Sequence, residues 1–133
     1  MTERAATWPG PIFAITLFTD DLAASIEFYR RVFGLEVQYE DPQSAVFAFP
    51  NILINLLDSA EAPGLVAPEP VAPATAGVRL QLTINVDDTD AVCRSLAQLG
   101  VELLGGPIDR PWGVRTATFR DPGGHVWEVA SPI

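Results

Sequence analysis

RPWGVRTATFRDPGGHVWEVA, residues 110–130, is the stretch that decides the fold. It predicts two strands joined by a tight turn at residues 121–124, because Pro122 restricts one backbone angle and the two glycines allow the positive φ of a sharp reversal. Residues 125–130 are strand formers that carry one carboxylate, Glu128. A charge in an apolar strand lies on a solvated face or takes part in chemistry. The rest of the chain decides between these two roles for Glu128.

The composition is that of one globular domain. The chain has 133 residues, of which 48% are hydrophobic and 19% charged, and its net charge is −9. This acidity argues against nucleic-acid or anionic-membrane binding and favours neutral or cationic ligands. The single cysteine, Cys93, excludes an internal disulfide, and residues 1–10 lack an apolar signal core. We therefore expect a cytoplasmic protein with no nucleic-acid or membrane partner.

The first half of the chain predicts a strand, a helix and three further strands. Residues 11–19 form the expected first strand, and the Asp20–Asp21 pair caps a helix over residues 22–33 that Gly34 ends. Three strands are expected next, at residues 35–40, 45–49 and 52–57. Residues 58–77 contain four prolines and no hydrophobic period, which indicates a linker or surface loop.

The same order of elements returns after this linker. Residues 78–86 alternate between apolar and polar side chains, which predicts a strand with one wet face. Asp87–Asp88 cap the next expected helix, and Gly100 ends it. A strand at residues 101–104 and a long loop at residues 105–113 then lead into the two strands of the opening stretch.

The two halves can be laid over each other. Asp21 matches Asp88 at the start of a helix, and residues 52–56 match residues 125–129 in the last strand of each half. Such matches in one order indicate an internal duplication. We therefore expect an α+β fold in a single domain made of two βαβββ modules, at residues 10–57 and 78–133.

Two phrases of the sequence resemble the vicinal oxygen chelate superfamily, which includes glyoxalases, bleomycin-resistance proteins and extradiol dioxygenases. They are DLAASIEFY with VFGL, within residues 21–35, and DPGGHVWE at residues 121–128. The likeness covers nearly the whole chain except the first ten residues and the linker. It implies that each module curls its sheet into an open half-barrel, with the helices outside and a ligand cleft inside. The superfamily hosts many reactions and also non-catalytic drug binders, so the fold alone assigns no reaction.

Metal-dependent members of this superfamily place ligands at one position on the first and last strand of each module. The resemblance puts those positions at Ala14, Asn55, Gln81 and Glu128. A transition-metal site needs about three His or carboxylate ligands, and only Glu128 is an anion here. His125, the one histidine, is an odd number of residues from Glu128 and is expected on the opposite face of the strand. We therefore predict no metal and no other cofactor.

Because it departs from the metal pattern, the chain resembles the antibiotic-binding members of the superfamily. These members hold a drug in a cleft without breaking a bond. Such a cleft needs flat apolar surface and a few convergent polar groups. The candidate surfaces are Phe18, Phe49 and Trp112. The candidate polar contacts are Asn55, Gln81, Thr83, Arg115 and Glu128. The loop at residues 105–113 would bring Trp112 over a ligand. The aromatic surfaces suit a hydrophobic compound, and the acidity of the chain favours a cationic one.

Each candidate also has a purely structural role open to it. Trp112 can cap its own loop, and Arg115 can form a surface ion pair. Glu128 can be solvated, or buried and paired with Arg115. Trp127 is expected in the core, and Trp8 can pack on a partner subunit.

Three functions remain open from the sequence. The first is a non-catalytic protein that binds or sequesters a small hydrophobic or cationic compound such as an antibiotic. The second is a metal-dependent lyase, isomerase or dioxygenase of the same superfamily. The third is a metal-free enzyme with Glu128 as its lone catalytic base. The resemblance also implies a homodimer, because half-barrels leave sheet edges and apolar surface for a second chain to cover.

Overall fold

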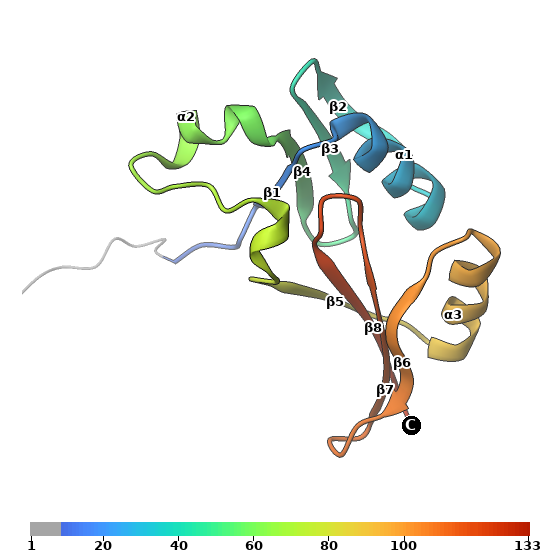
Figure 1. Ribbon diagram of the computed structural model, residues 1–133. Helices are drawn as coiled ribbons and strands as arrows, with labels where there is room; N and C mark the ends of the chain where they lie inside the picture. The colour runs from blue at the N-terminus through green and yellow to red at the C-terminus, as the bar shows by residue number, and fades with distance from the viewer. Residues whose placement is uncertain (1–8) are drawn as a thin grey trace, which may run out of the picture.

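A computed structural model describes residues 9–133 as two βαβββ modules joined by an irregular linker (Figure 1). The first module consists of β1 (Ala14–Thr19), α1 (Leu22–Phe33), β2 (Val37–Asp41), β3 (Ser44–Ala48) and β4 (Leu53–Asp58). The second consists of β5 (Gln81–Asn85), α3 (Thr89–Gln98), β6 (Leu103–Asp109), β7 (Val114–Arg120) and β8 (Val126–Pro132). Trp8 lies outside the described residues.

Each module forms its own four-stranded mixed sheet, and the two sheets have the same topology. The strand orders are β1-β4-β3-β2 and β5-β8-β7-β6. The first and last strands of each module pair in parallel, and the remaining pairs are antiparallel. Both sheets are open, with α1 and α3 outside them on the side away from the linker (Figure 1). The predicted α+β fold with duplicated βαβββ modules is confirmed.

The helix starts and stops come from local capping, as expected. Asp21 Oδ1 accepts a hydrogen bond of 3.0 Å from the Ala24 amide, and Asp88 Oδ1 accepts one of 3.1 Å from the Ala91 amide. These bonds satisfy amides that the first turn of each helix leaves without a partner. Gly34 ends α1 in the left-handed conformation, with φ of 66°.

The linker has more local structure than its sequence suggested. It holds two short 3-10 turns and one short helix: η1 (Ser59–Glu61), α2 (Pro63–Val66) and η2 (Ala74–Ala76). Asp58 caps the first turn through a bond of 3.0 Å from the Ala60 amide. Proline suits the first turn of a helix because its missing N–H would find no partner there. The prolines therefore start and stop short helical pieces instead of excluding them.

The expected long loop at residues 105–113 is wrong, because β6 continues through Asp109. Its pairing with β7 shifts register near Gly105, which breaks the alternation that marks a strand in the sequence. Gly106 has a φ of 85°, and a Cβ there would clash with the carbonyl of Thr116 and lie 2.8 Å from the Ala117 Cα. Only residues 110–113 form the hairpin loop.

An aromatic cluster joins the two modules. The α1 side chains Tyr29 and Phe33 meet Trp127 of β8, with ring centroids 5.9 and 4.8 Å apart. Phe49 stacks on Trp127 at 5.4 Å and 15°. Tyr29 is 0% exposed and Trp127 2%, which confirms the expected core position of Trp127. Aromatic pairs of this kind add about 0.5–1.5 kcal/mol each beyond burial of their area, so this cluster holds the modules together.

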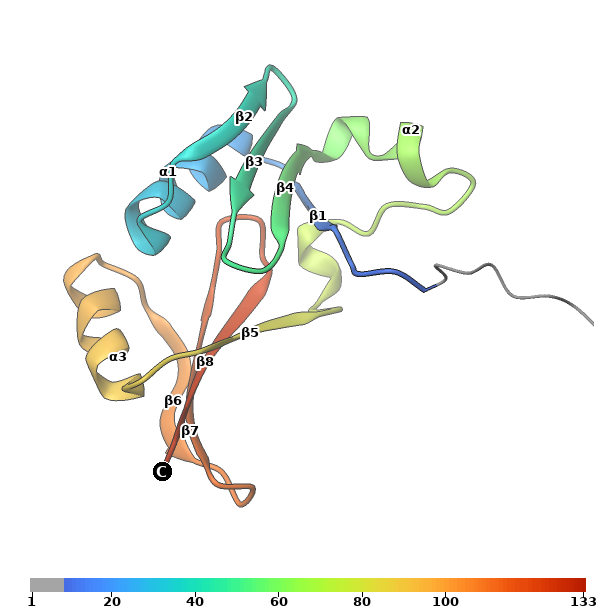
Figure 2. The same ribbon diagram turned by 180° about the vertical axis from the view of Figure 1, so that it is seen from behind.

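The turn between β7 and β8 reaches into the first module, as the view from behind shows (Figure 2). No helix among residues 9–133 is long and apolar enough to cross a membrane.

Candidate functional site

The sheet faces that the helices leave uncovered carry polar pairs at equivalent places. In the second module, Thr83 Oγ1 donates a hydrogen bond of 3.0 Å to Glu128 Oε1 between β5 and β8. In the first, Asn55 Nδ2 donates one of 3.5 Å to Thr16 Oγ1 between β4 and β1. Neighbouring residues on these strands, such as Ile54, are buried on the other face. We call these two uncovered surfaces the open faces.

The registers of the parallel pairs support the duplication residue by residue. Thr16 lies beside Asn55, and Thr83 lies beside Glu128. Two residues earlier on the same strands and faces stand Ala14 and Gln81, which are both exposed. The positions that the resemblance marks are therefore Ala14 with Asn55 in one module and Gln81 with Glu128 in the other.

The donors at these four positions do not fit a divalent transition metal. They comprise one methyl group, two neutral amides and a single carboxylate, whereas such ions are held by imidazole, thiolate or several carboxylates. Within residues 9–133, no group of three or more His, Cys, Asp or Glu side chains is arranged to hold a metal ion. The absence of a cofactor stays a prediction.

Two of the candidate site residues lie away from the open faces. Phe49 packs in the aromatic cluster against Phe33 and Trp127. Arg115 is held by two carboxylates, with its Nε 2.8 Å from Asp90 and its Nη1 2.9 Å from Asp109. These hydrogen bonds raise the pKa of the guanidinium above its ordinary value. The pairing of Glu128 with Arg115 that the sequence left open is therefore wrong.

Trp112 stands at the tip of the β6–β7 hairpin and is 70% exposed. Its ring lies 5.9 Å from the Arg110 guanidinium carbon, within the range of a cation–π contact. Trp112 therefore packs on its own loop, and this contact involves no residue of the open faces.

A pocket of about 200 Å³ lies where β1, the linker and the β7–β8 turn meet. Phe18, a candidate from the sequence, forms part of its wall with Thr16 of the same strand. Leu80 and His125 also line it. Glu128, Asn55, Gln81 and Thr83 do not belong to its lining.

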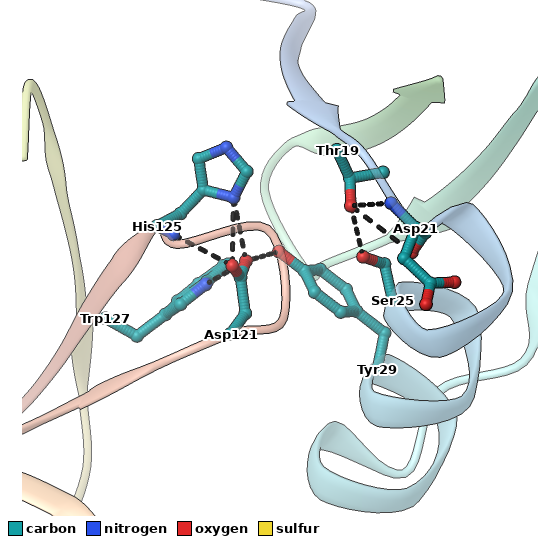
Figure 3. Close-up of polar contacts among 7 residues, drawn as sticks. All are labelled: Thr19, Asp21, Ser25, Tyr29, Asp121, His125 and Trp127. Atoms are coloured by element: carbon teal, nitrogen blue, oxygen red, sulfur yellow. Dashed lines mark hydrogen bonds and ion pairs between the residues drawn. The ribbon is translucent and has the colours of Figure 1, made fainter. Parts of the chain in front are cut away.

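Asp121 organises this end of the molecule, which the sequence did not indicate (Figure 3). The residue is 3% exposed. It accepts hydrogen bonds from the Tyr29 hydroxyl at 2.7 Å and from Trp127 Nε1 at 3.2 Å. It also accepts bonds from the His125 amide at 2.9 Å and from His125 Nδ1 at 2.9 and 3.1 Å. The one local signal that could have found this cluster is the histidine four residues after the aspartate of the turn.

The electrostatics of this cluster follow from burial and from these bonds. Burial raises the pKa of Asp121, but the hydrogen bonds and charge of His125, together with the Tyr29 hydroxyl, outweigh it and hold that pKa below its ordinary value. Burial, and then the charge of Asp121, raise the pKa of Tyr29 well above its ordinary value. The pair therefore consists of an ionised carboxylate and a neutral phenol.

The two glycines of the turn serve different purposes, in contrast to the expectation from the sequence. Gly124 supplies the positive φ, at 90°. Gly123 makes room for the imidazole, because a Cβ there would lie 2.6 Å from His125 Cε1. The ring is thus seated directly over the turn.

Comparison with known proteins shows which family has this architecture. A model of the Glyoxalase/Bleomycin resistance protein/Dioxygenase superfamily matches residues 12–129. The uncharacterized protein YraH of Bacillus subtilis (strain 168) is 29% identical over 122 residues, which cover 89% of this chain and 95% of YraH.

Two solved structures share the fold along almost their whole length. Lactoylglutathione lyase from Agrobacterium tumefaciens is 28% identical with a TM-score of 0.74, and the match covers 93% of this chain and 95% of the lyase. TnmS3, an antibiotic binding protein from Streptomyces sp. CB03234, is 25% identical with a TM-score of 0.72, and the match covers 95% of this chain and 98% of TnmS3. With its duplicated modules and a family match along nearly its whole length, this chain belongs to the Glyoxalase/Bleomycin resistance protein/Dioxygenase superfamily.

Proposed function

We propose that this protein binds a small hydrophobic or cationic organic molecule on its open faces without the help of a metal. The observation that carries the proposal is the donor set at the four equivalent positions, where Glu128 is the one charge among Ala14, Asn55 and Gln81. A carboxylate hydrogen-bonded to Thr83 attracts a cation or a hydrogen-bond donor. The net charge of −9 adds a long-range attraction for cations.

The likeness to TnmS3 supports this proposal, because that protein is described as antibiotic binding. On this basis the function is sequestration: the compound is held and released chemically unchanged. Phe18, partly buried at the border of the open face, supplies apolar surface for it. Asn55, Gln81, Thr83 and Glu128 supply the polar contacts.

Binding is tested with untagged protein and a panel of cationic aromatic antibiotics, by isothermal titration calorimetry. We expect saturable binding that a chelator leaves unchanged, with the compound recovered intact. Glu128→Gln keeps the shape and removes the charge, so it should weaken binding of cations at low salt. Glu102→Gln, at an exposed position outside the open faces, is the matched control. Stoichiometric nickel, zinc, iron or manganese in the purified protein would overturn the metal-free proposal.

A metal-dependent lyase, isomerase or dioxygenase is the second candidate function. The likeness to lactoylglutathione lyase supports it. A third candidate is a metal-free enzyme with Glu128 as base. Turnover that Glu128→Gln abolishes while ligand affinity is kept would favour catalysis over sequestration.

We further propose that the protein acts as a cytoplasmic homodimer. Ile12 and Phe13, just before the edge strand β1, are 73% and 77% exposed, and Ile108 on the edge strand β6 is 45% exposed. Exposed apolar side chains beside open sheet edges suit a partner surface. Sedimentation velocity at micromolar concentration should give a dimer, and a monomer there would contradict this proposal.

A further inference from the structure

His125 is held in a way that determines which of its ring nitrogens carries the proton. Nδ1 lies 2.9 and 3.1 Å from the two carboxylate oxygens of Asp121. An ionised carboxylate can only accept hydrogen bonds, so Nδ1 is the donor and Nε2 of the neutral ring is an acceptor. The close-up shows the second ring nitrogen turned away from Asp121 (Figure 3).

The imidazole is fixed both by the carboxylate of Asp121 and by the turn on which it lies. Tyr29 and Trp127 donate hydrogen bonds to the same carboxylate, so Asp121 cannot swing away from the ring. Gly123 lets the ring sit directly on the turn. A ring oriented by a buried, multiply bonded carboxylate is pre-organised to accept a proton, because the carboxylate stabilises the imidazolium that forms.

His125 forms part of the wall of the pocket between β1 and the linker. Phe18, Pro73 and Leu80 give that pocket apolar surface, and its volume of about 200 Å³ suits one aromatic ring with small substituents. Two charged side chains, Asp20 and Arg79, complete the polar part of the wall.

We propose that this pocket binds a small planar compound with an acidic hydroxyl, a phenol or an enol, whose O–H group is taken up by His125 Nε2. The O–H bond breaks, an Nε2–H bond forms, and the electron pair stays on the oxygen as phenolate or enolate. Asp121 behind the ring stabilises the imidazolium, and Arg79 in the wall stabilises the anion. Asp20 opposes the anion from the same wall, and the phenol of Tyr29, which stays neutral, does not compete for the proton.

This second site adjoins the open face of the first module, with which it shares Thr16 and Phe18, and it goes beyond the binding proposed there. None of Asn55, Gln81, Thr83 and Glu128 lines the pocket. Its ligand donates a hydrogen bond to an imidazole, whereas the ligand of the open face meets a carboxylate. The two sites can therefore be separated by single substitutions.

The test uses 4-nitrophenol, because its phenolate absorbs visible light and its phenol does not. It is added to untagged protein at a pH where the free compound is half ionised. We expect a saturable gain in phenolate absorbance. His125→Asn keeps a donor for Asp121 and removes Nε2, so it should weaken binding about tenfold or more while the fold is kept. Glu128→Gln should leave this binding unchanged.

The chain has one histidine, so nitrogen NMR of labelled protein reads this site alone. The Nε2 resonance should move towards the position of a protonated nitrogen when 4-nitrophenol is bound. Equal affinity in His125→Asn, or no binding at millimolar 4-nitrophenol, overturns the proposal and leaves the open faces untouched. Loss of 4-nitrophenol binding in Glu128→Gln but not in His125→Asn would place the phenol on the open face, and this result would also overturn the proposal.

Discussion

The Tyr29 hydroxyl donates a hydrogen bond of 2.7 Å to Asp121 Oδ2, across 92 positions of the sequence. The donor belongs to the helix of the first module and the acceptor to a turn of the second. Both side chains are almost completely buried. This bond therefore ties the orientation of His125 to the packing of the two modules against each other.

Tyr29→Phe should destabilise the protein by about 1.5–3 kcal/mol, the usual contribution of a buried hydrogen bond to a charged group. The ring stays in the aromatic cluster, so the loss measures the hydroxyl alone. Urea unfolding followed by tryptophan fluorescence should show a lower midpoint with an unchanged slope. Tyr39→Phe is the control, since Tyr39 is 57% exposed and should leave the midpoint where it is. Equal midpoints for the two variants would contradict the role of the Tyr29 bond.

Stability should fall in acid because of Asp121. Its pKa in the folded protein lies below the ordinary value, so between the two values the unfolded chain binds more protons than the native one. The contribution is fully present above pH of about 3.9, the ordinary value for Asp, and is lost as the pH falls through the folded pKa. Urea midpoints measured from pH 7 downwards should show this loss.

Asp121→Asn removes this titration, so its midpoint should depend less on pH in the acid range than that of the natural sequence. Its stability at neutral pH should also be lower, because the amide presents N–H groups to partners that are themselves donors. Carbon NMR of the Asp121 carboxyl group gives its pKa directly. An ordinary or raised value there would refute the prediction without any variant.

Gly106→Ala should destabilise the protein by about 1–3 kcal/mol or more, the range for overpacking of a tight site. The new methyl group meets the backbone of Thr116 and Ala117, and the positive φ adds strain. Gly64→Ala is the matched control, since a Cβ there meets nothing within 4 Å and its φ is ordinary. Thermal unfolding should separate the two variants, and similar melting temperatures would show that β6 and β7 do not approach this closely.

Arg115→Gln should leave both stability and ligand affinity nearly unchanged. Its ion pairs with Asp90 and Asp109 lie in contact with water, where such pairs contribute little. The side chain also points away from the open face that holds Glu128. Calorimetry with a ligand of the open faces should give the same affinity as the natural sequence, and a large loss would return Arg115 to the site.

Phe49 and Phe18 show how far the periodicity of the sequence predicts the direction of a side chain. Both were expected on the ligand side, and Phe18 does border a pocket, whereas Phe49 stacks on Trp127 against the core. Phe49 comes just after β3, where strand alternation no longer predicts direction. Its position depends on Trp127, a residue of the other module that has no local relation to it.

Local chemistry was enough to predict the helices, their caps and the duplication. Asp21 and Asp88 bond to amides three residues away, and hydrophobic spacing reports burial within one element. Glu128 was singled out differently, because only the resemblance to the superfamily marks it as the one charge among four equivalent positions. Residues 110–130 therefore indicated the fold, and they also contain the carboxylate of Glu128.

The role of the turn beside that carboxylate depended on long-range packing. In the sequence, Asp121 looks like an ordinary turn residue. Its role depends on Tyr29, because packing brings the Tyr29 hydroxyl within 2.7 Å of the Asp121 carboxylate. Two side chains so far apart in the chain carry no mutual pattern, because their contact exists only once both modules are folded. The same packing turns His125 into an oriented base at a pocket, a property that arises from three dimensions and not from spacing along the chain.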